Sequence, residues 1–364
     1  MSAIDLVLFG AFDRHNYGDL LLARLAAEAA GRRRVHFAGL RAWDARAVAG
    51  FAVRSLADVL ADVSPGGYDL YHVGGEILDC DAWTTAVMLL DEESAARVIA
   101  RFDADPCARR REAVRRLGTH RPLPYVLRRR DAPGVRCLGF APCGGTGLDA
   151  LPRSVQRAAC AALVEADEAR VRDARTRAIF AQWGLRLPLA PDPAEGLAAS
   201  NLSIAFEAHA AGWRERLGAY RLVQFAAECA TDPWLAALAA WLEARRGSGE
   251  RLVLVRAGAA PWHDTLESLA RLSRFLSPSA RAATCLIAEL GLEAIGGLAA
   301  GAVEVCATSL HLLLTARAFG VPTVALEREA GVARKLRAYF GTWHPEQTFW
   351  APGSCRPVGR LPLE

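Results

Sequence analysis

The sequence predicts an α/β protein built from two parallel-sheet domains that face one another across a cleft. Short apolar segments rich in β-branched residues alternate with segments of helical periodicity along most of the chain, as expected of parallel strands joined by helices. The alternation is interrupted at residues 187–194 (LPLAPDPA), where three prolines in eight residues form a stiff connector. The 364 residues are 52% hydrophobic, which is enough apolar sequence for two cores.

Composition argues against several classes of protein. A net charge of +4 on 364 residues is too small to indicate binding to nucleic acid or to an anionic membrane. The nine cysteines form no CxxC pair and are odd in number, which indicates reduced thiols and neither a disulfide framework nor a metal site. No uncharged apolar run is long enough to span a membrane. We therefore expect a cytoplasmic protein, with peripheral attachment to the inner face of the membrane as the alternative. The oligomeric state stays open.

The first strand is predicted at Ile4–Phe9, and it runs into a turn-rich loop, Gly10–Asp19. The segment Leu20–Ala30 is rich in leucine and alanine and should form a helix capped by Gly18 or Asp19. A strand, a glycine-bearing loop and a helix make up the anion- or nucleotide-binding opening of a doubly wound fold. The loop lacks the GxGxxG pattern, so it does not specify a dinucleotide.

Two further strands end in paired glycines. Tyr68–Val73 runs into Gly74-Gly75-Glu76, and Val135–Phe140 runs into Pro142–Gly145. Paired glycines let a ligand or another backbone approach closely, and a tight turn is the alternative. His72, inside the first of these strands, reads as a core histidine. Cys143 could act as a nucleophile, although no obvious base accompanies it.

The segment from Ala82 to about Arg130 is less regular, and its arginine runs are most simply solvated helix faces. The other helices are expected at Ser154–Asp167, Thr176–Trp183 and Thr265–Arg274. The other strands are expected at Val35–Gly39, Ala52–Val53, Ala169–Asp173, Leu202–Ala205, Arg221–Phe225, Arg251–Val255, Thr284–Ile287, Val303–Cys306 and Thr323–Leu326.

The most informative stretch is Ala302–Phe319, which reads as a buried strand, a sharp turn and a helix that Gly320 stops. Thr308 and Ser309 are N-cap residue types. His311 therefore lies in the first turn of a helix, just past the carboxyl end of a strand, where open α/β sheets bind ligands and helix N-termini collect anions. A histidine that only caps a core helix is the alternative.

Other polar residues follow strands of the second half and are expected to point into the same cleft. They are Gln224, Arg256 with His263-Asp264, and Glu327-Arg328. For His263-Asp264 the alternative is a cap on the helix Thr265–Arg274.

An ordered set of motifs resembles the polysaccharide pyruvyl transferase family over nearly the whole chain. These are Asn16–Leu22 (NYGDLLL), Val73–Leu78 (VGGEIL), Pro124–Leu127 followed by Gly139–Pro142, Val171-Arg172-Asp173 with Gly184, Asp192-Pro193-Ala194, and Ser309-Leu310-His311 with Gly320-Val321-Pro322. Lys335 falls near a position that often carries lysine in the family.

The resemblance implies a glycosyltransferase-B-like pair of Rossmann-like domains that transfers the enolpyruvyl unit of phosphoenolpyruvate, as a ketal, onto a sugar hydroxyl pair. Phosphoenolpyruvate is then a co-substrate and no cofactor is needed. Residues 1–186 would form the acceptor-side domain, 187–345 the donor-side domain and 346–364 a tail. The candidate catalytic residues are His311 and Asp19; the candidate donor contacts are Arg172, Ser309, Thr308, Arg256 and Lys335; the candidate acceptor contacts are Asn16, Gly18, Gly74, Gly75 and Glu76.

Two positions depart from the family pattern. Glu76 replaces a common glycine, and Ser309 stands where many members carry an arginine that would contact the donor. Two other functions therefore stay open: a glycosyltransferase that uses a nucleotide sugar, and a catalytically altered member that only binds a carbohydrate or a partner. For Asp19, a simple helix cap is the alternative to a catalytic role.

Overall fold

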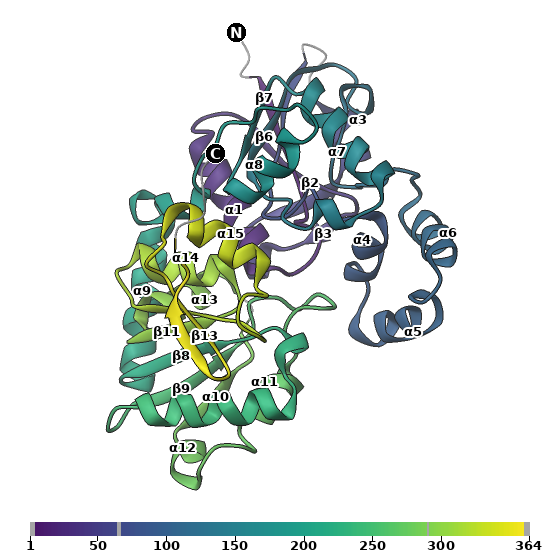
Figure 1. Cartoon of the computed structure of the whole chain (residues 1–364). Coiled ribbons are helices and arrows are strands. Elements are labelled where there is room, and N and C mark those ends of the chain that lie inside the picture. Colours follow the sequence, from purple (N-terminus) through teal and green to yellow (C-terminus); the bar gives the residue numbers. More distant parts are fainter. Residues whose placement is uncertain (1–3, 64–66, 290, 360–364) are drawn as a thin grey trace. The chain divides into compact units, whose positions relative to one another are not determined.

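The computed structural model describes residues 4–63, 67–289 and 291–359, and the chain divides into two compact units (Figure 1). The first unit comprises Met1–His15 and Leu22–Pro193, and the second comprises Asn16–Leu21 and Ala194–Glu364. The division falls after Pro193, whereas the sequence prediction placed it between residues 186 and 187. The connector stays with the first unit because Leu189 pairs with Val171 and Asp192 binds Arg172.

The first unit contains a seven-stranded sheet in the order β3-β4-β2-β1-β5-β6-β7. All neighbouring strands run parallel except β3, which is antiparallel to β4. The parallel strands thus follow the Rossmann order, in which the third, second and first strands are followed by the fourth, fifth and sixth. The strands are β1 (Asp5–Phe9), β2 (Val35–Gly39), β3 (Trp43–Asp44), β4 (Ala52–Ser55), β5 (Tyr68–His72), β6 (Val135–Cys143) and β7 (Glu168–Val171).

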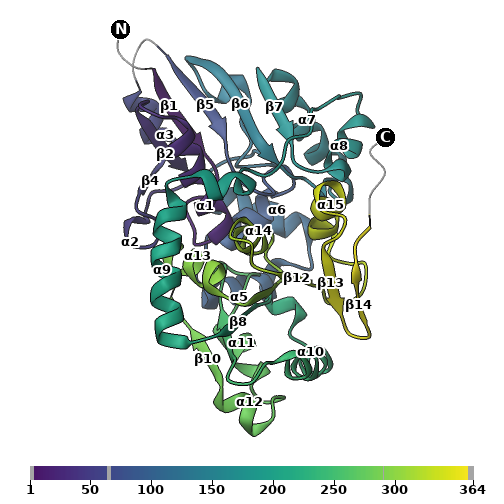
Figure 2. The ribbon, with the colours of Figure 1, turned by 90° about the vertical axis from the view of Figure 1, so that its left-hand side faces the viewer.

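The second unit repeats this order in the sheet β10-β9-β8-β11-β12-β13-β14, with β14 antiparallel to β13. Figure 2 shows β13 and β14 side by side in yellow. They lie in the segment predicted as a tail, so this segment contributes Thr348–Ala351 and Ser354–Pro357 to the second sheet. Residues 360–364 lie outside the described residues. The strands are β8 (Tyr220–Gln224), β9 (Arg251–Val255), β10 (Thr284–Ile287), β11 (Glu304–Ala307), β12 (Thr323–Leu326), β13 (Thr348–Ala351) and β14 (Ser354–Pro357).

Strands β1, β8 and β11 are buried at every residue, as parallel strands are when helices cover both faces of the sheet. Each unit has its own hydrophobic core. The core of the first includes Val7, Leu70 and Leu138, and the core of the second includes Val223 and Leu254.

The helices after β5 replace the irregular segment that the sequence predicted from Ala82. Each of the three begins at an aspartate, Asp81, Asp91 or Asp105, whose carboxylate accepts a backbone N–H of the first turn. The runs Arg109–Arg111 and Arg115-Arg116 lie on the third of these helices, in agreement with their interpretation as helix faces. The helices of this half are α1 (Tyr17–Ala29), α2 (Arg46–Ala49), α3 (Leu56–Asp62), α4 (Ala82–Met88), α5 (Glu92–Phe102), α6 (Pro106–Leu117), α7 (Arg153–Glu165) and α8 (Ala174–Ala181).

In the second half, the strand predicted at Leu202–Ala205 is wrong, because these residues begin α9 (Leu202–Leu217). Leu202, Phe206 and Ala210 are buried at helical spacing. Gly296 lets the Phe206 ring pack closely, since a Cβ at this glycine would lie 2.3 Å from a ring carbon. The other helices are α10 (Asp232–Arg245), α11 (Leu266–Leu272), α12 (Pro278–Ala282), α13 (Leu292–Gly301), α14 (Leu310–Ala318) and α15 (Arg334–Trp343).

Candidate functional site

The strand order of the second sheet reverses between β8 and β11, and ligands bind at such a point in open α/β sheets. Gln224 ends β8, and Thr308 and Ser309 follow β11. The side-chain oxygen of Gln224 accepts hydrogen bonds from the backbone N–H of Thr308 at 3.1 Å and of Ser309 at 2.9 Å. One glutamine thus holds the turn that leads into α14.

The other end of Gln224 donates to Asp264 Oδ2 at 2.8 Å, and the same oxygen accepts from the backbone N–H of Ala257 at 2.6 Å. Asp264 therefore ties the end of β8 to the loop after β9. The structure assigns the cap of α11 to Thr265, whose hydroxyl accepts from Ser268 N at 3.0 Å. The capping alternative for Asp264 is wrong.

Asp264 should make the stability of the protein depend on pH. Burial raises the pKa of Asp264 from its ordinary 3.8 to about 6. Because the folded state binds this proton more tightly than the unfolded state, the contribution of Asp264 to stability is complete below about pH 4 and is lost as the pH rises through about 6. Asp264→Asn should therefore lose stability relative to wild type at pH 4 and recover part of that loss at pH 7.

Urea unfolding at several pH values measures this difference, with Glu207→Gln on an exposed part of α9 as the control. Parallel pH profiles for wild type and Asp264→Asn would contradict the assignment.

Ser309 caps α14, since its hydroxyl accepts from Leu312 N, and His311 is the second residue of this helix and is buried. The segment Asn16–Leu21 belongs to the same unit and packs on this histidine at Gly18. A Cβ at Gly18 would lie only 2.0 Å from Nδ1 of His311. A glycine is therefore required here, and the structure brings together two residues of the predicted site that are 293 positions apart in the sequence.

Asn16 caps α1, because its side-chain oxygen accepts from the backbone N–H of Gly18 at 2.9 Å and of Asp19 at 3.3 Å. The predicted caps, Gly18 and Asp19, are wrong. The Asn16 amide also lies 3.4 Å from Nε2 of His263, and Tyr17 N donates to Ala257 O at 2.7 Å. Asp19 is buried in the first turn of α1. Because Asn16 caps the helix, the capping alternative for Asp19 is excluded, and its catalytic role stays a prediction.

Arg256 directly follows β9, and its charge acts on the nearby Asp264 carboxylate. Its Nε is buried and has no hydrogen-bond partner among the described residues. A guanidinium in this state is suited to bind an anion.

The remaining residues predicted for the second unit differ in role. Glu327 organises the loop after β12, since it accepts from the Gly331 backbone at 3.1 Å and from Nε of Arg337 at 2.9 Å. Lys335 is the second residue of α15 and makes no ion pair with any other described residue. No hydrogen bond or ion pair among the described residues joins Lys335 to His311.

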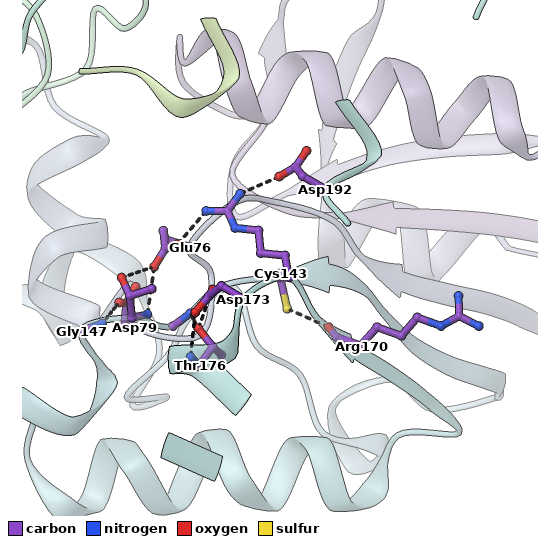
Figure 3. A network of polar contacts seen from close by, with 11 residues as sticks. Glu76, Asp79, Cys143, Gly147, Arg170, Asp173, Thr176 and Asp192 are labelled. Atoms are coloured by element: carbon purple, nitrogen blue, oxygen red, sulfur yellow. Dashed lines mark hydrogen bonds and ion pairs between the residues drawn. The ribbon is translucent and has the colours of Figure 1, made fainter. Parts of the chain in front are cut away.

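In the first unit, the ends of β5, β6 and β7 gather a network of carboxylates around one arginine (Figure 3). Arg172 is only 1% exposed; its Nη2 lies 2.6 Å from Oε1 of Glu76 and its Nη1 lies 2.7 Å from Oδ2 of Asp192. The backbone N–H and the hydroxyl of Thr146 each donate to the second Glu76 oxygen at 3.1 Å. The predicted donor contact Arg172 and the predicted acceptor contact Glu76 thus form a single ion pair.

The glycines of this region serve close backbone packing. Gly144 N donates to Gly75 O at 2.7 Å, and Gly74 and Gly75 are both buried. A Cβ at Gly144 would lie 2.2 Å from the Glu76 carboxylate. The loops after β5 and β6 therefore pair with one another, so a backbone approach explains the paired glycines.

Three other titratable groups here are structural. Cys143 is fully buried, and burial raises the pKa of its thiol, which argues against a nucleophile. His72 is buried between Gly139 O and Leu127 N, and burial lowers its pKa to about 4. Asp173 caps α8, and burial, followed by the charge of Glu76, raises its pKa to about 6.

The sequence reading missed a buried network in the first unit at Asp13, Arg14 and Tyr125. The Tyr125 hydroxyl donates to Oδ1 of Asp13 at 2.6 Å, and Arg14 donates to the same hydroxyl at 3.2 Å. Oδ2 of Asp13 accepts from Leu40 N at 2.7 Å, so the network links the loop after β1 to the end of β2. Burial raises the pKa of Asp13. No sequence pattern connects residues 112 positions apart.

The part of the chain that the structure describes contains no group of metal-ligating side chains that could hold an ion. Among the same residues, no helix has the length and the apolar content to cross a membrane. A pocket of about 430 Å³ lies between α5 and α6, and its lining is arginine-rich. The lining residues are Arg97, Val98, Arg101, Phe102, Glu112, Arg115 and Arg116.

Solved structures share the fold of this chain at low sequence identity. HepE of Anabaena, solved with UDP and glucose, matches with 14% identity and a TM-score of 0.51, over 97% of this chain and 86% of that one. The UDP-GlcNAc 2-epimerase of Methanocaldococcus jannaschii matches with 11% identity and a TM-score of 0.48, over 89% and 83%. A search of curated proteins found no match to this chain.

The likeness to HepE shows a fold made of two Rossmann-like units of the glycosyltransferase-B kind, in agreement with the two strand orders. The family is shown by a second comparison. The family model "Polysaccharide pyruvyl transferase" matches residues 143–329, just over half of the chain. The match contains the ends of β6 and β7, the connector and the turn with His311. The chain therefore belongs to the polysaccharide pyruvyl transferase family.

Proposed function

We propose that this protein transfers a pyruvyl group from phosphoenolpyruvate, as a ketal, to a sugar of a polysaccharide or glycan precursor. Family membership supports a transferase. The observation that carries the proposal is the close packing of Gly18 on His311, beside the switch point of the second sheet. A histidine held in one orientation at the start of a helix is suited to deliver a proton to a bound anion.

The donor has a carboxylate and a phosphate, and its site needs cationic donors in fixed positions. In the proposal, Arg256 binds one of these groups, since its buried Nε has no partner among the described residues. The positive end of α14, with Thr308 and Ser309, faces the other. Lys335 is a further predicted contact. Arg172 is a further predicted contact, and its two terminal nitrogens already bind the Glu76 and Asp192 carboxylates.

The chemistry requires two proton movements. His311 donates a proton to the methylene carbon of phosphoenolpyruvate, which leaves an oxocarbenium-like centre at the adjacent carbon. Asp19 accepts the proton of one sugar hydroxyl as its oxygen bonds to that centre. A second hydroxyl then closes the ketal, the carbon–oxygen bond to phosphate breaks, and phosphate leaves with the remaining proton. Asn16, Gly18, Gly74, Gly75 and Glu76 are the predicted acceptor contacts in this scheme.

A thermal-shift experiment with the full chain tests the choice of donor. Phosphoenolpyruvate at 100 times its Kd should stabilise the wild type by about 2.7 kcal/mol. Arg256→Ala should lose most of this effect, whereas Arg274→Ala, at an exposed position after α11, should retain it.

Two results would select the alternatives. Stabilisation by a uridine or thymidine diphosphate sugar, with none by phosphoenolpyruvate, would indicate a nucleotide-sugar glycosyltransferase. Binding of carbohydrate without phosphate release across a broad acceptor panel would indicate a member that only binds.

We also propose that the protein acts in the cytoplasm, with no cofactor beyond the co-substrate. The nine cysteines support a reducing compartment, since all are free thiols in the described part of the chain.

A further inference from the structure

Three hydrogen-bond donors converge on the Glu76 carboxylate at the ends of β6 and β7. They are Nη2 of Arg172 at 2.6 Å, and the backbone N–H and hydroxyl of Thr146 at 3.1 Å each. An arginine, a backbone N–H and a hydroxyl are the partners that proteins use to hold a carboxylate or phosphate of a ligand. We name these donors, with Gly144 beneath them, the Arg172 cradle.

The cradle is preformed. Arg172 is held from its other side by Asp192, which is fully buried. The loop after β6 is held by Gly145 N, which donates to the Thr176 hydroxyl at 3.0 Å. Gly144 approaches so closely that a Cβ would lie 2.2 Å from Oε1 of Glu76. The contacts with Asp192 and Thr176 hold Arg172 and the loop after β6 without help from Glu76.

Glu76 enters the cradle from the solvent side. Its side chain is 23% exposed, whereas Arg172 and Asp192 are 1% and 0% exposed. Figure 3 shows Glu76 and Asp192 on opposite sides of the same guanidinium. A ligand carboxylate or phosphate that approached the cradle would meet the place that Glu76 already fills.

Charge also opposes a second anion. Glu76 and Asp192 both contact Arg172, and the Asp173 carboxylate lies close enough to feel the charge of Glu76. Three acidic side chains thus surround one arginine, and an added anion would be repelled. Removal of Glu76 would take away one of the two carboxylates that bind the terminal nitrogens of Arg172 at 2.6 and 2.7 Å.

We propose that the Arg172 cradle is an anion-binding site that Glu76 closes, and that Glu76 thereby determines the class of acceptor. The sugar that binds at this edge of the first sheet is uncharged there, because an acidic or phosphorylated sugar must displace Glu76. The proposal on the class of acceptor rests on the proposed function, because that function places the acceptor on the first unit.

The first experiment measures binding of inorganic phosphate and needs no turnover. All variants carry Arg256→Ala, so that the proposed donor site does not contribute. Glu76→Gly should gain phosphate affinity by at least tenfold over the background protein, seen by calorimetry and as an increase in Tm. Adding Thr146→Val should reduce the gain, because it removes the hydroxyl, one of the three donors, and keeps the backbone N–H.

The matched control is Asp149→Asn. It frees Arg175, which lies close to the cradle, donates to Thr146 O and is 37% exposed, so it tests whether any unpaired arginine would bind phosphate. No gain in affinity is expected. Glu76→Gln keeps the volume of the side chain and removes its charge, and it should gain less than Glu76→Gly because it still fills the cradle. A folded Glu76→Gly protein without a gain, or an equal gain in Asp149→Asn, would overturn the proposal.

The second experiment compares kcat/KM for glucose-containing and glucuronate-containing oligosaccharide acceptors. Wild type should prefer the neutral acceptor by at least tenfold, and Glu76→Gly should narrow this ratio. Equal use of both acceptors by wild type would overturn the specificity role. The two proposals can fail separately. A gain in phosphate binding by Glu76→Gly would support the Arg172 cradle even if neither wild type nor any variant released phosphate from phosphoenolpyruvate, a result that would contradict the proposed function.

Discussion

Replacement of His311 by alanine should lower the rate of phosphate release from phosphoenolpyruvate by about 10²–10⁴-fold, the range observed when a general acid is removed. His311 is the proposed source of the proton that reaches the methylene carbon, and Gly18 holds its ring from one side. His311→Gln keeps most of the volume but cannot act as the acid, so it should show a similar loss. Release of phosphate is measured with an acceptor present, alongside Tm and phosphoenolpyruvate affinity.

His209→Ala is the matched control, because this histidine lies on α9 of the same unit and is 45% exposed. It should retain wild-type turnover. Wild-type turnover by either His311 variant would show that the acid is another group. If His311→Ala loses turnover because it unfolds, whereas His311→Gln stays folded, the turnover of His311→Gln tests the role of the histidine.

Replacement of Arg172 by methionine should lower the free energy of unfolding by about 3–5 kcal/mol, as is found when one partner of a buried ion pair is removed. The change leaves the Glu76 and Asp192 carboxylates without the guanidinium that joins them at 2.6 and 2.7 Å. Asp192 is fully buried, so water cannot replace the hydrogen bond that its carboxylate loses.

The control is Arg175→Met, which removes an exposed arginine of the same unit from its pair with Asp149 at 2.8 Å. Exposed pairs contribute about 0–1 kcal/mol, so this variant should remain near wild type. Urea unfolding followed by circular dichroism compares the two. Equal losses for both variants would show that burial of the Arg172 network contributes little.

The sequence predicted most strands because their β-branched residues and flanking glycines are local signals. It failed where a local signal was ambiguous. The start of α9 reads as a strand because Leu202, Ile204 and Phe206 alternate, and the helical spacing shows only when Ala210 and Trp213 are included. The bounds of α4–α6 were not predicted, although each of these helices begins at an aspartate cap.

The sequence predicted Gln224, Arg256 and His311 as site residues because each lies at or shortly after the end of a strand, and the structure has them in these places. Their partners could not be predicted, since the contacts join positions far apart in the chain. The Tyr125–Asp13 hydrogen bond and the Glu76–Arg172 ion pair depend on the packing of loops after different strands. The assignment of Arg172 to the donor therefore rested on its residue type, its place at the end of a strand and a family motif, without knowledge of its carboxylate partners.

The membership of Asn16–Leu21 in the second unit has a consequence for synthesis on the ribosome. The Tyr17 hydroxyl bonds to the Thr315 hydroxyl at 2.7 Å, across 298 positions of sequence. At about 5–20 residues per second, the first turn of α1 waits roughly 15–60 s for this partner to be made. During that interval the first unit can fold, while the contact of Gly18 with His311 cannot yet form. The proposed acid therefore reaches its place only when nearly the whole chain has been translated.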